Sequence, residues 1–205
     1  MPASIRFASG KQIKDRIDYK YDTRGNICEI TENGHLSARY TYDKLNRLIR
    51  EDNKAHNKTV LFSYDSAGNI TERCEYDYTD NTVIPHKGAG THYEYKYEGD
   101  RLVSFFGMAY TYDKQGNPTK NRGFTAEWKN GKLTKYHKTT FAYDSLGRRV
   151  KKGNKSFIYD SDGRLVKQSN GLEFIYDASG LAGFKYNNAM YFYRKDVQGL
   201  SLIHI

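Results

Sequence analysis

The sequence predicts an all-β fold, built as a repetitive antiparallel meander of β-hairpins. A short motif headed by tyrosine recurs every 15–22 residues over most of the 205-residue chain. Aromatic residues precede the motif at a spacing of two, which places them on one face of a strand. Helix-period patterning is essentially absent. A short fixed period is the signature of a repeat architecture, so we expect the recurring residues to build a scaffold.

Each copy of the motif is predicted to form a turn. Aspartate at the opening and glycine three positions later match a type I turn closed by a left-handed residue. Glycine accepts the positive φ without a Cβ clash, and asparagine is the usual second choice. The predicted turn residues are Tyr21, Asp22 and Gly25; Tyr42, Asp43 and Asn46; Tyr64, Asp65 and Gly68; Tyr112, Asp113 and Gly116; Tyr143, Asp144 and Gly147; Tyr159, Asp160 and Gly163; and Tyr176, Asp177 and Gly180.

Two divergent units support this interpretation of the motif. Residues 97–102 and 128–133 reach their leucine, Leu102 or Leu133, one residue sooner than the other units do. Their Gly99-Asp100 and Asn130-Gly131 pairs are typical of two-residue hairpin turns, which lack the extra bulge residue. Replacing the longer turn of the other units by a two-residue turn is expected to shorten the loop by one residue.

The residues on either side of the motif are predicted to form strands about five to seven residues long. The alternating aromatic pairs are Tyr40/Tyr42, Phe62/Tyr64, Tyr95/Tyr97, Tyr110/Tyr112, Phe141/Tyr143, Phe157/Tyr159, Phe174/Tyr176 and Tyr191/Tyr193. Further turn signals close the other end of several units at Asn33-Gly34, Gly153-Asn154, Asn170-Gly171 and Asn187-Asn188. Aromatic cross-strand pairs contribute roughly 0.2–1 kcal/mol each, so we expect one stacked aromatic face.

The spacing of the motif divides the chain into a flank, an array and a tail. Residues 1–18 are expected to be an incomplete strand pair, and residues 19–199 the repeat array. Residues 79–91 interrupt the array as an inserted loop, which is either a recognition element or a tolerated surface insertion. Residues 200–205 resemble the conceptual translation of a sequencing-adapter end, so we expect the chain to be a piece of a longer protein.

Composition favours a sheet with one aromatic and one solvated face. Aromatic residues make up 15% of the chain, while the mean hydropathy is −0.85. No stretch approaches the ~20 apolar residues that span a bilayer, and no signal peptide is visible at Met1. The net charge of +9 comes from lysines and arginines spread along the chain. We interpret them as a solvated strand face that discourages edge aggregation, so a nucleic-acid partner is not expected.

No motif for catalysis, metal binding or cofactor binding is found. A Gly-x-Ser-x-Gly elbow, a His-Glu-x-x-His pair and a phosphate-binding loop are all absent from the sequence. The six histidines, which are His35, His56, His86, His92, His137 and His204, share no metal-ligand spacing. We therefore expect no catalytic residues, no metal and no cofactor. Cys28 and Cys74 are expected to be free thiols, with a disulfide as the alternative.

The repeated Tyr-Asp-x-x-Gly-Asn/Arg motif over residues 19–199 resembles the YD-repeat, or RHS-repeat, family. The tract Phe141-Ala142-Tyr143-Asp144-Ser145-Leu146-Gly147-Arg148-Arg149 is similar to the RHS repeats of large bacterial surface proteins. The resemblance implies a ribbon of hairpins that spirals into a hollow β-shell, as in the teneurins, and a secreted or cell-surface location.

The resemblance also implies two alternative functions. In bacterial members the shell encloses a C-terminal toxin domain, and neither that domain nor the Asp-Pro-x-Gly self-cleavage motif occurs in this chain. We therefore expect a structural shell segment whose partners are the rest of the same polypeptide and an enclosed toxin domain. The alternative is an adhesion module that binds carbohydrate or a cell-surface protein. Fold alone does not choose between them.

Overall fold

The computed structural model describes residues 4–9, 12–80, 82–83, 85, 88–178, 180–195 and 201–202. Within these ranges the chain consists of strands, turns and loops, without a helix. Every paired strand is antiparallel to its neighbour, which confirms the predicted all-β meander. No helix of the described residues is long and apolar enough to cross a membrane. The chain divides into two compact units, residues 1–109 and 110–205.

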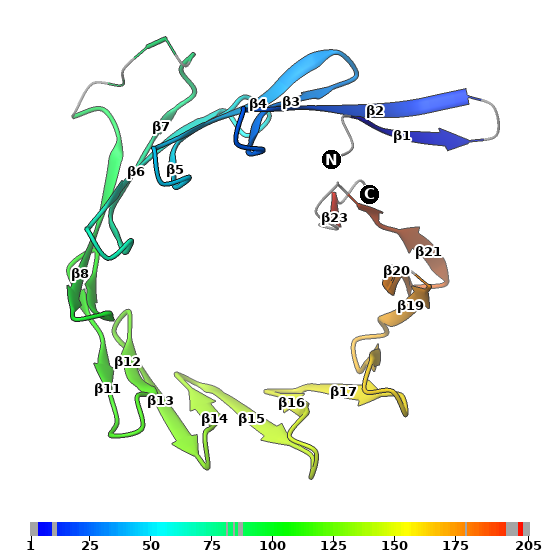
Figure 1. The fold of residues 1–205 in the computed structure, drawn as a ribbon. Coiled ribbons are helices and arrows are strands. Elements are labelled where there is room, and N and C mark those ends of the chain that lie inside the picture. Colours follow the sequence, from blue (N-terminus) through cyan, green and yellow to red (C-terminus); the bar gives the residue numbers. More distant parts are fainter. Residues whose placement is uncertain are drawn as a thin grey trace. The chain divides into compact units, whose positions relative to one another are not determined.

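The first unit is a single ten-stranded sheet in which each strand pairs with the next one along the chain (Figure 1). The predicted flank pairs with the array, because its first strand is hydrogen-bonded to the strand that carries Tyr19 and Tyr21. The strands are β1 (Ser4–Ser9), β2 (Gln12–Tyr21), β3 (Ile27–Glu32), β4 (His35–Tyr42), β5 (Leu48–Asn53), β6 (Lys58–Tyr64), β7 (Ile70–Asp77), β8 (Thr91–Glu98), β9 (Arg101–Phe105) and β10 (Met108–Ala109).

The second unit repeats this arrangement in an eleven-stranded sheet, again in chain order. Its strands are β11 (Thr111–Tyr112), β12 (Pro118–Asn121), β13 (Phe124–Lys129), β14 (Lys132–Tyr136), β15 (Thr139–Tyr143), β16 (Arg149–Lys152), β17 (Lys155–Tyr159), β18 (Leu165–Gln168), β19 (Glu173–Asp177), β20 (Gly180–Tyr186) and β21 (Ala189–Phe192). A separate short pair joins β22 (Arg194–Lys195) to β23 (Ser201–Leu202). The strands are two to ten residues long, a wider range than predicted.

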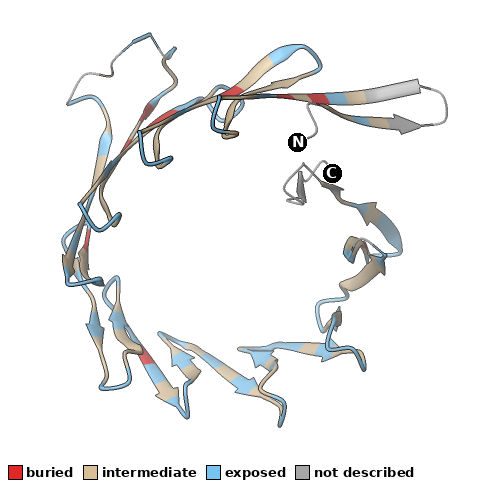
Figure 2. Ribbon diagram, in the orientation of Figure 1, coloured by how far each residue is buried: buried red, intermediate tan, exposed pale blue. Residues whose placement is uncertain are grey.

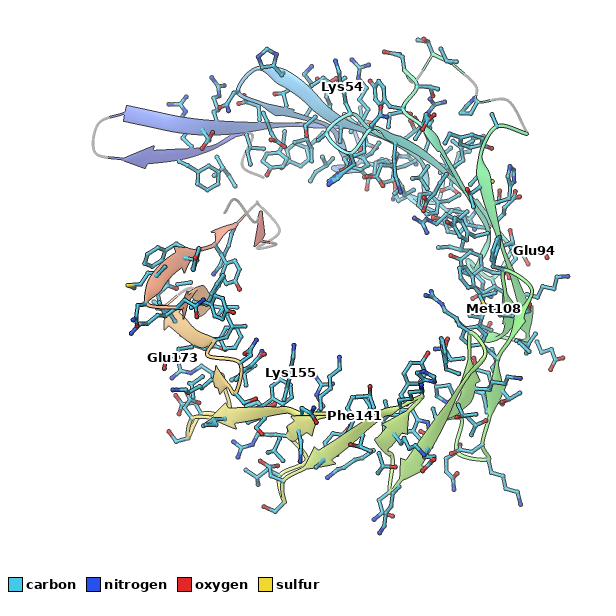
Figure 3. The ribbon with its side chains drawn as sticks, turned by 180° about the vertical axis from the view of Figure 1, so that it is seen from behind. Lys54, Glu94, Met108, Phe141, Lys155 and Glu173 are labelled. Atoms are coloured by element: carbon cyan, nitrogen blue, oxygen red, sulfur yellow. The ribbon has the colours of Figure 1, made fainter. Side chains whose placement is uncertain are left out.

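Side chains project from both faces of each sheet, and few of them are buried (Figures 2 and 3). The buried apolar residues of the first unit are Ile17, Tyr19, Ala38, Val60, Cys74, Tyr76 and Phe105, and Ala126 is buried in the second. Ring contacts supplement this thin core. Phe105 lies 4.7 Å from Tyr95, and Phe184 lies 4.9 Å from Tyr191, measured between ring centroids. The strand ladder and such cross-strand pairs therefore carry much of the stability.

Residues 78–90, called the insert below, connect β7 to β8 and nearly coincide with the loop predicted at 79–91. The insert is attached to the sheet through Arg50 of β5. The guanidinium of Arg50 donates from Nη1 to the Val83 carbonyl and from Nη2 to the Asp80 carbonyl, both at 2.8 Å. Arg39 adds an ion pair to Asp80 at 3.4 Å. The insert is therefore bound by specific polar contacts on strands β4 and β5.

The end of the insert leaves no room for a side chain at Gly90. A Cβ built there would lie 2.5 Å from the Glu75 carbonyl oxygen and 2.5 Å from the Tyr76 ring. We expect Gly90→Ala to destabilise the first unit by about 1–3 kcal/mol, the usual cost of overpacking. Gly88→Ala is the matched control, because the same construction at Gly88 meets nothing within 4 Å. Urea unfolding followed by circular dichroism measures both, and equal midpoints would contradict the expected clash.

Candidate functional site

The repeat motif forms a hairpin turn of one recurring geometry. At the first copy, the Asp22 N–H donates to the Asn26 carbonyl at 2.8 Å, and the Gly25 N–H donates to the Asp22 carbonyl at 3.1 Å. Gly25 has a φ of 86°, and Asn46 in the equivalent position of the next copy has a φ of 62°. The strand register shifts just before the heading tyrosine, so that Tyr21 pairs with Ile27. A turn closed by a left-handed residue and followed by a bulge has this register.

The carboxylate of the motif aspartate closes the turn by accepting two hydrogen bonds from the residue four positions later. At Asp65, Oδ1 accepts the backbone N–H of Asn69 at 2.8 Å, and Oδ2 accepts the Asn69 side-chain amide at 3.0 Å. At Asp144 the same two oxygens accept the backbone N–H and the Nε–H of Arg148, at 2.9 and 2.7 Å. Asparagine and arginine are interchangeable at this position because both place an N–H donor on the second carboxylate oxygen. The same contacts recur at Asp22, Asp43, Asp113 and Asp160.

These hydrogen bonds favour the ionised carboxylate. The Asn69 side chain lowers the pKa of Asp65, and the Arg148 side chain lowers the pKa of Asp144. The pKa is lowered at Asp22, Asp43, Asp113 and Asp160 as well. In the unfolded chain aspartate returns to its ordinary pKa near 3.9.

We expect acid to destabilise the fold through these turns. Because the folded pKa values are lowered, the unfolded chain binds protons first as the pH falls. The stabilisation is complete above the unfolded pKa of about 3.9, and it is lost as the pH falls through the folded values. The urea midpoint should therefore decrease as the pH is lowered below about 5. Replacing Asp65 and Asp144 by asparagine should flatten this dependence, and an unchanged slope in that variant would contradict the assignment.

A second set of contacts links many of the repeats to the one before them. The hydroxyl of Tyr64 donates to the carbonyl of Leu48, the residue that follows the preceding turn, at 2.6 Å. Trp128 stands at the motif position of its unit, and its indole Nε1–H donates to the Pro118 carbonyl at 2.8 Å in the same way. Equivalent bonds run from Tyr42 to Ile27, Tyr97 to Ile70, Tyr143 to Leu133, Tyr159 to Arg149 and Tyr176 to Leu165.

A third set of contacts links the repeats whose turn ends in arginine to the repeat that follows. The guanidinium carbon of Arg47 lies 4.7 Å from the ring centroid of Tyr64, and Arg47 Nη1 donates to the Asp65 carbonyl at 3.0 Å. Arg148 and Arg164 lie over the rings of Tyr159 and Tyr176 at 5.2 and 5.4 Å. A cation over an aromatic face is attractive, so one motif residue closes its own turn and also contacts the next repeat.

A separate cluster of side chains lies between β7 and β8. The thiol Sγ of Cys74 lies 3.1 Å from His92 Nδ1, and the same nitrogen lies 2.9 Å from Glu72 Oε1. All three donor atoms lie within 4.8 Å of one another. Cys74 is buried, whereas His92 and Glu72 are partly exposed. These three residues are called the donor cluster below.

The comparison with known protein families agrees with the repeat geometry. The family described as teneurin YD-shell matches residues 62–204, which is more than half of the 205-residue chain. The chain belongs to the teneurin YD-shell family.

Individual relatives of this YD-shell chain are much longer proteins. A toxin of Burkholderia cenocepacia (strain H111), named double-stranded DNA deaminase toxin A, is 31% identical over 149 residues, which cover 66% of the chain and 9% of the toxin. Two crystal structures are also similar. The TcdB2-TccC3-Cdc42 structure has a TM-score of 0.39 at 12% identity, over 88% of this chain and 11% of the other. TcdB2-TccC3 without its hypervariable C-terminal region has a TM-score of 0.40 at 10% identity, over 94% and 12%.

One predicted turn residue of the YD-shell chain, Gly180, has the expected positive φ of 103° but already lies in a strand. Gly180 is the first residue of β20 and pairs with Asp177, while Tyr176 pairs with Leu181. This turn is one residue shorter than the others, because leucine follows Gly180 where the other copies have asparagine or arginine. The two divergent units have the predicted two-residue turns, because Glu98 pairs with Arg101 and Lys129 with Lys132. The bulge that was predicted to be missing is present, since the strand register still shifts just before Tyr97 and just before Trp128. Residues 196–200, at the end of the predicted array and the start of the predicted tail, lie outside the described residues.

Two features were not predicted from the sequence: the hydrogen bonds from the motif tyrosine hydroxyls to the preceding repeat, and the donor cluster. Phenylalanine occurs two residues before the motif, at Phe62, Phe141, Phe157 and Phe174, but the motif position itself holds only tyrosine or tryptophan. That contrast is a sequence signal for a required donor. The donor cluster has a weaker signal in the sequence. A search for spaced histidines finds only His92, and it overlooks Glu72 and Cys74, which lie two residues apart on β7. His86 and His204 lie outside the described residues. Cys28 and Cys74 are not joined in a disulfide, which confirms the predicted thiols.

Proposed function

We propose that the chain is a structural wall segment of a hollow YD shell that encloses a C-terminal toxin domain of the same, longer polypeptide. The observation that carries this proposal is the set of contacts between repeats. In both units a motif side chain donates to the backbone of the preceding repeat, as Tyr64 does to Leu48 and Tyr159 to Arg149. A ribbon bound from repeat to repeat is suited to an extended wall that does not depend on a thick core.

The toxin-related part of the proposal is supported by a relative. The similar protein from Burkholderia cenocepacia is named a deaminase toxin, and this chain matches only 9% of it. The motif residues close the turns and bond to neighbouring repeats. We therefore propose no catalytic role for the wall segment itself. We also propose that the parent polypeptide lies outside the cell or on its surface, where a toxin carrier acts.

Protease protection in the full-length polypeptide tests this function. The wild-type shell should protect the downstream domain from an added protease, whereas Asp65→Ala combined with Asp144→Ala should expose it by weakening two turns. Lys114→Ala is a control, because Lys114 is an exposed turn residue. Cleavage of the downstream domain in the wild-type protein as fast as in that domain on its own would overturn the enclosure proposal.

A second candidate function, adhesion to carbohydrate or to a cell-surface protein, is favoured by exposed rings. Phe106, Phe124 and Phe192 are large apolar side chains that are exposed. Apolar rings exposed on a surface are suited to stacking on a sugar or on a partner. A glycan array probed with the folded chain distinguishes the two functions. Binding that is lost in Phe106→Ser supports adhesion, and the absence of binding to any glycan weakens it.

A further inference from the structure

The pairing of β7 with β8 contains features that destabilise it. The insert interrupts the chain here, and the two strands pair through four residue pairs, from Glu72↔Glu94 to Glu75↔Thr91. Glu72 lies directly opposite Glu94, the residue that Figure 3 labels on this strand, so two carboxylates share one face. Like charges in this position destabilise a strand pair. Lys96 contacts Glu94 at 3.3 Å, but both side chains are largely exposed, where an ion pair contributes little.

The donor cluster occupies this same junction. Cys74 pairs with His92 in the strand register, and Glu72 lies two residues before Cys74 on the same face. His92 Nδ1 therefore faces both the thiol and the carboxylate, at 3.1 and 2.9 Å. Its other nitrogen, Nε2, is buried and has no hydrogen-bond partner among the described residues. The Tyr76 ring packs edge-on against the imidazole, with the centroids 6.1 Å apart.

We propose that Glu72, Cys74 and His92 bind a divalent transition-metal ion of the zinc class. This inference does not depend on what the shell encloses. Thiolate, imidazole and carboxylate are the donors that Zn²⁺ accepts in proteins, and three protein ligands leave the fourth position to water. Softer and harder ions fit this mixed donor set less well. The partly exposed His92 and Glu72 give the ion and its water a path to solvent.

The distances between the donor atoms are compatible with such an ion. Zinc–ligand distances of about 2.0–2.3 Å place tetrahedral ligand atoms about 3.3–3.6 Å apart. The donor atoms of the cluster are 2.9 and 3.1 Å apart and all lie within 4.8 Å. To accept the ion, His92 Nδ1 moves a few tenths of an ångström away from both neighbours. Side-chain rotations of Glu72 and Cys74 bring their donor atoms, which lie within 4.8 Å of each other, up to about an ångström closer together.

The bound ion acts as a clamp across the insert. It joins two ligands on β7 to one on β8, and its positive charge compensates for the opposed carboxylates of Glu72 and Glu94. Because ion binding requires the folded register, the free energy of binding adds to the free energy of folding. The clamp therefore fixes the strand pair at the point where the insert separates its two halves in sequence.

Titration of the full 205-residue chain with Co²⁺, used as a spectroscopic substitute for Zn²⁺, tests the proposal. We expect one equivalent of Co²⁺ to produce a thiolate-to-cobalt charge-transfer band that added Zn²⁺ removes. Cys74→Ser should abolish the band, and His92→Gln should weaken Co²⁺ binding by about 100-fold or more, since loss of an outer-shell partner alone costs 10–100-fold. Cys28→Ser is the matched control and should keep the band, because Cys28 lies on β3 outside the cluster.

A second measurement keeps the test independent of how well the variants fold. Zn²⁺ should raise the urea midpoint of the wild type and of Cys28→Ser, and it should leave the midpoint of Cys74→Ser unchanged. Absence of the cobalt band in a wild-type chain with the expected β-type circular dichroism would overturn the proposal. So would an equal Zn²⁺ effect on wild type and Cys74→Ser. In either case the contact between His92 and Glu72 is an ordinary histidine–carboxylate pair.

Discussion

Replacing Arg50 by methionine is expected to destabilise the first unit by about 3–5 kcal/mol, the usual cost of removing one partner of a buried ion pair. Asp52 is only 2% exposed, and both of its oxygens accept the Arg50 Nε–H at 2.9 Å. Thr59, which is fully buried, donates its hydroxyl to the same carboxylate at 2.8 Å. Without the guanidinium, a buried carboxylate keeps one hydroxyl donor and loses its counter-charge. The insert also loses three bonds from Arg50, to the Val83 and Asp80 carbonyls and to the Thr79 hydroxyl.

Urea unfolding at neutral pH measures this effect, and a double variant separates its causes. Arg50→Met combined with Asp52→Leu removes both charges, and replacing a buried pair by apolar side chains is often nearly neutral. We expect the double variant to recover much of the lost stability while the insert stays more accessible to proteolysis. A single variant within about 1 kcal/mol of the wild type would show that the Asp52 carboxylate does not depend on Arg50, because exposed pairs have that size.

The turns could be predicted from the sequence because their chemistry is local. The aspartate, the left-handed residue and the donor that follows all lie within five residues, as in Asp65, Gly68 and Asn69. Asparagine at position 46 was expected to replace glycine, and it has a φ of 62°. Gly180 shows the limit of this argument. Its turn lacks the donor after the glycine, and the strand begins at the glycine itself, two residues earlier than in the other copies.

The contacts between distant segments could not be predicted in the same way. Arg50 meets the carbonyl of Val83, 33 positions along the chain, because the insert is attached to the sheet there. Cys74 meets His92 only because the strand register resumes after the insert with these two residues opposite each other. Turn residues and strand periodicity fix neither the length of an insert nor the register beyond it. The hydroxyl contacts do leave a mark in the sequence, since phenylalanine is missing from the motif position in every copy.

That missing phenylalanine leads to the second large effect, at Tyr64. Its hydroxyl donates to the Leu48 carbonyl at 2.6 Å, and its ring lies 4.7 Å from the guanidinium carbon of Arg47. Burial raises the pKa of the Tyr64 hydroxyl, so the group stays a neutral donor at physiological pH. The side chain therefore contributes a hydrogen bond to the preceding repeat and a ring surface for its arginine.

We expect Tyr64→Ala to destabilise the first unit by about 3 kcal/mol, the lower end of the aromatic-to-alanine range, because the ring is only half-buried. Tyr64→Phe should cost about 1–2 kcal/mol, since it keeps the ring and leaves the Leu48 carbonyl without its donor. Tyr95→Phe is the matched control, because the Tyr95 ring packs on Phe105 and its hydroxyl has no hydrogen-bond partner among the described residues. If urea unfolding gave the two phenylalanine variants the same midpoint, the hydroxyl contact would not be what links one repeat to the next. The preference for tyrosine at the motif position would then have to come from the ring alone.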